Sequence, residues 1–201
     1  MNTTSEHAIR TILVGQSGGP TAAINASLAG VVRAAHTQGL RVLGMRNGIQ
    51  GFLEGKVVDL TEVLELTASE PKASEQAATN PGEKNLQLLR KTPSSWLGSC
   101  RFKLPDLGME LAASSEPAET SPIYQQIDAQ LKKYQVDAVL YIGGNDSMDT
   151  TDKLSRYFAQ VDSAVRVVGV PKTIDNDLEG TDHTPGFGSA ARFVASVTAE
   201  L

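Results

Sequence analysis

The sequence predicts an α/β domain built on an open, parallel sheet, and three observations lead to this prediction. Apolar runs with little alternation are typical of strands covered on both faces. Four such runs occur, at residues 11–14, 41–45, 136–142 and 165–170. Amphipathic helical segments separate them, with apolar stripes that include Ile24, Leu28, Val31, Val32 and Ala35, and then Ile123, Ile127, Leu131 and Tyr134. Strands that alternate with helices form right-handed parallel βαβ units.

Composition excludes several classes of function. The chain has 201 residues, 40% hydrophobic and 20% charged, which is ordinary for a globular protein. Its net charge of −5 offers no basic face for a nucleic acid. A single cysteine, Cys100, excludes an internal disulfide and is expected to be a packed residue rather than a nucleophile. No apolar run approaches the roughly 18 residues of a membrane span, so we expect a cytoplasmic protein that contacts no membrane.

The turn after the third apolar run predicts a phosphate site. Gly143 and Gly144 allow a tight turn and the close approach of a ligand, and Ser147 is predicted to be the N-cap of the next helix. Such a turn directs backbone N–H groups and the positive end of a helix dipole at an anion. By itself the segment also fits an ordinary βα turn. However, residues 15–20 form a second glycine-rich turn at the same sheet edge, where open α/β sheets bind ligands.

A third loop follows the last predicted strand. Pro171 is expected to end the pairing of that strand. The polar residues Lys172, Thr173, Asp175 and Asp177 follow within six positions. One interpretation is a polar loop with Asx turns. Beside two phosphate-type turns, these residues also supply what phosphoryl transfer needs, namely a base for an acceptor hydroxyl, positive charge, and oxygen ligands for Mg²⁺.

Other motifs carry no site. Residues 186–191 match the dinucleotide fingerprint GxGxxA, but the nearest predicted strand ends well before them, at residue 170. The sequence contains no GxxxxGK[ST] phosphate loop. Its three histidines lack the spacing of metal ligands.

Four segments, in this order and at these separations, resemble the phosphofructokinase family: GQSGGPTAAINASLAGVV, WLGSCRF, YIGGNDSMD and GVPKTIDNDLEGTDHTPGFGSA. The resemblance implies a doubly wound amino-terminal domain, a mostly parallel sheet flanked by helices, that holds the donor-phosphate site within residues 1–201. In the family a second domain completes the sugar-phosphate site. We therefore expect the chain to be truncated before the rest of that domain, with the apolar stripe of the last helix left to seek cover by self-association or added chain.

The resemblance also implies roles on the donor side. Gly18 and Gly19 resemble the glycines whose backbone meets the donor phosphate, and Ser147 lies in the matching turn of the third strand. Arg101 resembles the arginine that steadies the phosphoryl group during transfer. Considered alone, a single arginine is more often a solvated surface residue.

On the acceptor side, Asp175 corresponds to the base that takes the proton from the 1-hydroxyl of fructose 6-phosphate. Thr173 and Asp177 lie beside it in the substrate site. An alcohol is a poor nucleophile at neutral pH, so a positioned carboxylate and fixed positive charge are the expected remedies. Asn145 stands where many family members have a magnesium-binding aspartate, and its amide oxygen is a weaker ligand.

Two side chains bear on the phosphoryl donor. ATP-dependent members have glycine at the positions of Asp146 and Lys172, whereas pyrophosphate-dependent members resemble this chain at both. A carboxylate at Asp146 adds volume and negative charge where a nucleotide's α-phosphate lies, and Lys172 adds a catalytic and donor-binding cation suited to compact pyrophosphate. In the alternative interpretation, Asp146 caps the helix and Lys172 is a surface charge.

The function that these features imply is magnesium-dependent, reversible phosphoryl transfer from pyrophosphate to the 1-hydroxyl of fructose 6-phosphate, in glycolysis and gluconeogenesis. The full-length enzyme is expected to be a homo-oligomer. Two other functions remain open on the sequence. One is an ATP-dependent 6-phosphofructokinase, and the other is a phosphate-binding regulatory subunit without turnover.

Overall fold

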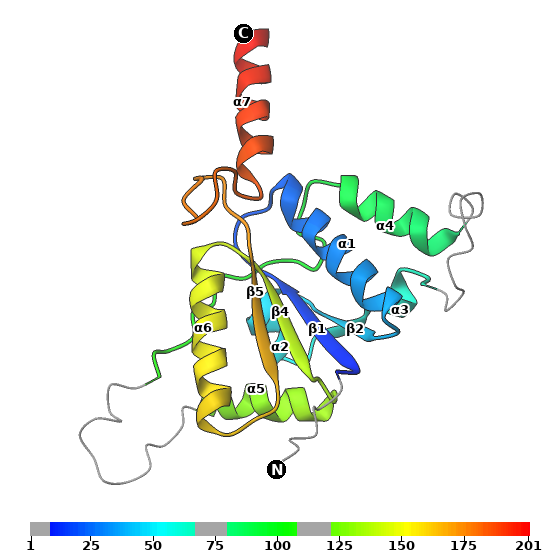
Figure 1. Cartoon of the computed structure of the whole chain (residues 1–201), viewed down its shortest axis with the longest axis vertical. Helices are drawn as coiled ribbons and strands as arrows, with labels where there is room; N and C mark the ends of the chain where they lie inside the picture. The colour runs from blue at the N-terminus through cyan, green and yellow to red at the C-terminus, as the bar shows by residue number, and fades with distance from the viewer. Residues whose placement is uncertain (1–8, 67–79, 108–121) are drawn as a thin grey trace.

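The computed structural model describes residues 9–66, 80–107 and 122–201, and within them the chain folds around a five-stranded sheet (Figure 1). The strands are β1 (Thr11–Gln16), β2 (Arg41–Met45), β3 (Val57–Asp59), β4 (Ala138–Gly143) and β5 (Arg166–Pro171). The helices are α1 (Ala22–Thr37), α2 (Gly48–Leu53), α3 (Leu60–Val63), α4 (Pro81–Lys91), α5 (Pro122–Lys133), α6 (Asn145–Gln160) and α7 (Phe187–Glu200).

The sheet has the strand order β3-β2-β1-β4-β5 and a topological switch point at its centre. β1 pairs in parallel with both β2 and β4, β4 pairs in parallel with β5, and only β3 joins antiparallel among these strands. After β1 the chain moves outward through α1 to β2, and after β4 it moves the other way through α6 to β5. The crevice between the carboxyl ends of β1 and β4 is where such sheets bind ligands. This arrangement confirms the predicted doubly wound, mostly parallel fold.

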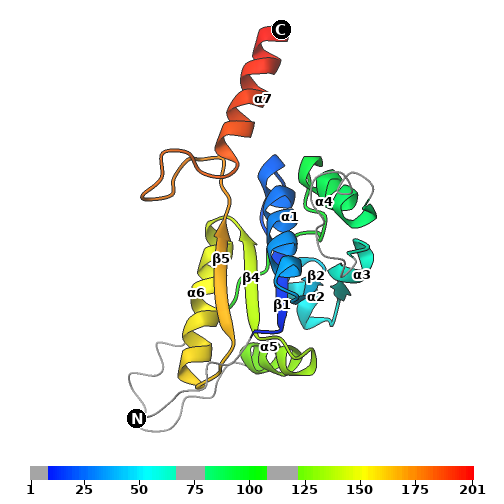
Figure 2. The same ribbon diagram turned by 45° about the vertical axis from the view of Figure 1, so that its right-hand side comes forward.

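Two apolar cores cover the two faces of the sheet. The first packs α1, α3 and α4 against one face, with Leu28, Val32 and Leu86 almost fully buried. The second packs α2, α5 and α6 against the other face, around Phe52 and Tyr124. Figures 1 and 2 show these helix layers on either side of the central strands. The strands alternate between the two cores, which explains why their sequences are apolar on nearly every residue.

The first predicted strand was two residues too short. β1 continues through Gly15, which pairs with residues of both β2 and β4, and Gln16, which pairs with β4. A Cβ on Gly15 would lie 2.8 Å from both the Met45 sulfur and the Tyr141 ring. Gly15 is therefore a strand residue at which the neighbouring side chains leave no room for a Cβ. The turn begins only after Gln16.

Other differences come from pairings that local sequence does not show. Residues 47–55 contain three glycines, a composition that favours a loop, and yet α2 occupies most of them. β3 and α3 were not predicted, because β3 has only three residues and depends on antiparallel pairing with β2. Pro171 was predicted to end the pairing of β5, but Lys172 N–H still donates to Gly143 O at 2.8 Å. Residues 67–79 and 108–121 lie outside the described residues.

α7 projects away from the sheet and has no buried residue (Figures 1 and 2). Its exposed apolar side chains include Phe193, Val194 and Val197, so the predicted stripe has no cover within the described part of the chain. β5 forms one edge of the sheet, and its Val168 is also exposed. Among the described residues, no helix is long and apolar enough to cross a membrane.

Candidate active site

The two glycine-rich turns approach each other at the switch point. Gly18 adopts a φ of 79°, a left-handed conformation that favours glycine. A Cβ placed on it would lie 3.6 Å from the backbone nitrogen of Gly144, so the turn after β1 and the turn after β4 are in close contact. Ser17 N–H donates to Ile142 O at 2.9 Å and fixes the first turn to the end of β4. The predicted donor glycines therefore lie together.

Lys172 joins these turns to the end of β5. Its ammonium donates to Gly19 O at 2.6 Å, and the residue is only 7% exposed. Burial lowers the pKa of Lys172 because a charged amine loses its hydration, while the negative charge of Asp175 opposes this shift. The interpretation of Lys172 as a surface charge is therefore wrong. Lys172 is a partly desolvated cation in the floor of the candidate site.

The start of α6 differs from the prediction. The N-cap is Gly144, without a side-chain hydrogen bond, and Ser147 lies inside the first turn, where it is 2% exposed. Ser147 is not the cap because the helix begins directly at the turn, with its N-cap three residues earlier than expected. Nor does Asp146 cap the helix, since its carboxylate lies 2.9 Å from the ammonium of Lys103. The backbone N–H groups of this first turn remain directed at the carboxyl edge of the sheet.

The loop after β5 is held by its own hydrogen bonds. Thr173 is 7% exposed, and its hydroxyl accepts from Asp175 N–H at 3.1 Å. Thr184 donates its hydroxyl to Thr173 O at 3.2 Å and its N–H to the Asn176 side chain at 3.0 Å. The turn is therefore made by the Thr173 hydroxyl rather than by the Asx turns of the first interpretation, and it fixes the backbone at Asp175. Asp175 itself is exposed to solvent at the mouth of the site.

Asn145 and Asp177 come together although 32 positions separate them. Asn145 Nδ2 donates to Asp177 Oδ2 at 3.2 Å. The pKa of Asp177 is lowered, first by this hydrogen bond and then by one from Thr173. The pair offers one amide oxygen and one carboxylate, both exposed. No cluster of three or more His, Cys, Asp or Glu side chains able to hold a metal occurs in the described segments.

The segment before Arg101 is fastened to the turn after β1. Ser99 Oγ donates to Gly18 O at 2.7 Å, and Ser17 Oγ donates to Cys100 O at 3.1 Å. Cys100 is buried, as expected for a packed residue. Arg101 follows directly and is exposed, without an ion pair to any residue that the structure describes. It therefore begins a loop at the same sheet edge as the two glycine turns.

Sequence reasoning missed Lys103, which pairs with Asp146 from the loop that carries Arg101. The sequence does show a second cation two residues after Arg101, and this spacing could have indicated that Lys103 lies near the site. Sequence reasoning also missed the buried Gln16, whose side chain binds Asn25 at 3.1 Å and Leu97 N–H at 2.8 Å. This polar contact holds the segment before Arg101 against β1.

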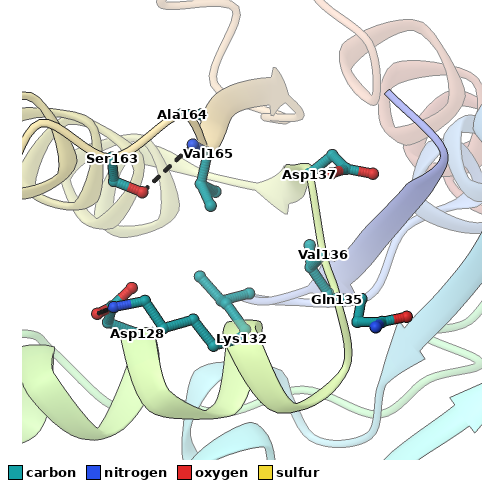
Figure 3. A pocket seen from close by; sticks show the side chains of 9 residues that line it. Asp128, Lys132, Gln135, Val136, Asp137, Ser163, Ala164 and Val165 are labelled. Carbon is teal, nitrogen blue, oxygen red and sulfur yellow. Dashed lines mark hydrogen bonds and ion pairs between the residues drawn. The ribbon is translucent and has the colours of Figure 1, made fainter. Parts of the chain in front are cut away.

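A separate depression lies at the opposite edge of the sheet (Figure 3). Its volume is about 250 Å³, and it lies between the end of α5 and the residues that precede β4 and β5, including Lys132, Val136 and Val165. Lys132 is already paired with Asp128 at 2.6 Å. The depression contains none of the predicted site residues. An open sheet edge with anion-binding turns does not need an enclosed cavity, so we place the candidate site at the carboxyl edge.

The fold and the site together define a doubly wound α/β protein in which two glycine-rich turns and a buried lysine meet at the switch point. The model of the phosphofructokinase family matches residues 11–201. The chain therefore belongs to the phosphofructokinase family.

Named relatives include both pyrophosphate-dependent and ATP-dependent enzymes. The chain is 39% identical, over 92% of its length and 37% of the relative's, to pyrophosphate–fructose 6-phosphate 1-phosphotransferase of Xanthomonas campestris. It is 32% identical, over 90% of its length and 44% of the relative's, to ATP-dependent 6-phosphofructokinase of Actinobacillus pleuropneumoniae. The structure of pyrophosphate-dependent phosphofructokinase from Nitrosospira multiformis matches with a TM-score of 0.72 and 34% identity, covering 96% of this chain and 41% of that one. The chain thus spans less than half the length of these relatives.

Proposed function

We propose that this chain forms the donor site of a pyrophosphate-dependent phosphofructokinase. The reaction would be reversible transfer of a phosphoryl group from pyrophosphate to the 1-hydroxyl of fructose 6-phosphate, giving fructose 1,6-bisphosphate and phosphate. The observation that carries the proposal is the burial of Lys172 at 7% exposure, with its ammonium 2.6 Å from Gly19 O. A cation fixed among the turns suits a compact, highly charged donor. The named pyrophosphate-dependent relatives support the same reading.

The chain's own residues supply separate parts of the chemistry. Asp175 would take the proton of the 1-hydroxyl as its oxygen attacks phosphorus, and the bond from phosphorus to the bridging oxygen of pyrophosphate would break. Lys172 and Arg101 would balance the negative charge on the transferred group and on the departing phosphate. The hydrogen bond from Asp175 N–H to the Thr173 hydroxyl holds the base in place.

Magnesium fits the donor set at Asn145 and Asp177. Mg²⁺ is usually bound by one or two carboxylates together with substrate phosphates and water. Asp177 supplies a carboxylate whose lowered pKa keeps it ionised, and Asn145 lies 3.2 Å from it. When bound, the ion would neutralise phosphate oxygens. Assembly into a homo-oligomer, a cytoplasmic location and a place in glycolysis belong to the same proposal.

The test is a coupled assay of the protein at its natural length. Fructose 6-phosphate is supplied with pyrophosphate or with ATP, with Mg²⁺ or with a chelator, and the reverse reaction is measured with phosphate. We expect turnover with pyrophosphate in both directions, loss of activity on chelation, and hardly any turnover with ATP. A preference for ATP would establish the ATP-dependent function that the Actinobacillus relative represents. Binding of pyrophosphate without any turnover would indicate a regulatory subunit instead.

A further inference from the structure

The donor edge carries a cation that the family motifs do not single out. Lys103 Nζ lies 2.9 Å from Asp146 Oδ1, and Asp146 belongs to the first turn of α6. The side chains of the two residues are 68% and 74% exposed. An ion pair this exposed contributes little to the free energy of unfolding. Stability therefore does not explain why Lys103 and Asp146 face each other at this edge.

The loop that carries Lys103 is fixed to the body of the domain. Phe102 packs against the second core and Leu104 is buried in it, while Lys103 between them and Arg101 before them stay exposed. This alternation turns both cations away from the core. The position of Lys103 is therefore set by packing on each side of it in the sequence.

Lys153 of α6 provides a second anchor for this loop. Its ammonium donates to Leu104 O at 3.2 Å and pairs with Asp106 and Asp149, each at 2.8 Å. Tyr124 of α5 also donates its hydroxyl to Pro105 O at 2.7 Å. These bonds hold the loop against α6, so the reach of Lys103 toward the first turn of α6 is a property of the fold.

A pyrophosphate bound at this edge would add negative charge that a mobile cation could balance. Pyrophosphate brings several negative charges to a helix start that already carries the Asp146 carboxylate. Lys172 cannot follow the ligand, because it is buried and bonded to Gly19. The Lys103 ammonium has a flexible stem and three donors, and the strength of its contact with Asp146 is small. It is able to leave Asp146 for another anion that comes within its reach.

We propose that Lys103 is a donor-binding residue, held by Asp146 in the free protein and transferred to the phosphate oxygens of bound pyrophosphate. This inference rests on the proposed function and adds a specificity-determining pair to it. Asp146 would then have two effects. It disfavours binding of a nucleotide, and in the free protein it holds the Lys103 ammonium near the position where pyrophosphate binds.

The experiment measures binding of imidodiphosphate, a pyrophosphate analogue that is not hydrolysed across its bridge, by calorimetry on the protein at its natural length. Lys103→Met is expected to weaken binding by about tenfold, the lower end for a hydrogen bond to a charged group. The Lys103→Arg variant should retain most of the wild-type affinity for imidodiphosphate. The matched control is Lys56→Met, since Lys56 is also exposed in an ion pair, with Glu54 at 2.5 Å, and should leave binding unchanged.

A double-mutant cycle separates direct contact from mere neutralisation of Asp146. In an Asp146→Asn background, Lys103→Met should still weaken imidodiphosphate binding by about tenfold, because the contact is made with the ligand. The KM for pyrophosphate should rise while the KM for fructose 6-phosphate stays constant. Loss of the whole effect in the Asp146→Asn background would overturn the inference.

The outcomes also distinguish this inference from the proposed function. Wild-type protein that turns over pyrophosphate, together with a Lys103→Met variant of unchanged affinity and KM, would overturn the role of Lys103 and leave the proposed function standing. Wild-type protein that neither binds imidodiphosphate nor uses pyrophosphate would overturn both.

Discussion

Replacing Lys172 by Met tests the buried cation directly. Methionine keeps the length and the apolar stem of lysine but removes the ammonium that lies 2.6 Å from Gly19 O at 7% exposure. A hydrogen bond to a charged group contributes about 1.5–3 kcal/mol, so donor affinity should fall by roughly 10–100-fold. We expect kcat to fall as well, because the same charge stabilises the transferred phosphoryl group.

Protein stability should respond differently from activity. Burial lowers the Lys172 pKa below its ordinary 10.5, so between the two values the folded protein binds fewer protons than the unfolded chain. The contribution of this group to the free energy of unfolding is therefore fully present above 10.5 and is lost as pH falls through the folded-state pKa. Lys172→Met should remove that pH-dependent increment. At neutral pH the variant should be as stable as the wild type or more stable, since no ammonium has to be desolvated.

The assay pairs steady-state kinetics, with pyrophosphate as the varied substrate, with denaturant unfolding from neutral pH to about pH 11. Lys56→Met again serves as the control, because Lys56 is exposed and distant in sequence from the site segments. A Lys172→Met protein that folds normally and keeps wild-type kcat and KM for pyrophosphate would refute the reasoning. So would strong destabilisation at neutral pH, since it would make Lys172 a structural residue.

Three further changes have defined outcomes. Asp146→Gly should admit ATP as a donor to a detectable degree in the coupled assay, and an unchanged donor preference would remove Asp146 from specificity. Asp175→Asn should lower kcat by about 10²–10⁴ with little change in substrate binding, whereas near-normal turnover would exclude it as the base. Gly143→Ala should destabilise the protein by about 1–3 kcal/mol in denaturant unfolding, because overpacking forces the turn to shift. Its Cβ would lie 2.7 Å from Ser17 O and would also meet the Ser147 hydroxyl, so unchanged stability would show that the turn adapts freely.

Local sequence was sufficient to predict the strands and helices whose own residues show an apolar run or an amphipathic stripe. The run before Gly143 is apolar on nearly every residue because both cores cover β4, and α5 shows its stripe because only one side of it is buried. The strand pattern also predicted that the two glycine-rich turns lie at one sheet edge, and the family resemblance added Arg101 to that site. The family model and the fold confirm that resemblance, while the roles assigned to individual side chains stay predictions.

Only the tertiary structure decided which contacts these side chains make. Whether Lys172 is a surface charge or a buried cation depends on the turn after β1, which is more than 150 positions away in the chain, and no local pattern contains that contact. The pairing of Asn145 with Asp177 and of Lys103 with Asp146 likewise joins separate loops. Hydrophobic patterning determines where strands and helices form, because burial acts on each segment's own periodicity. The charge and exposure of a site residue depend on which other segments pack against it, and those contacts arise only when the sheet has assembled.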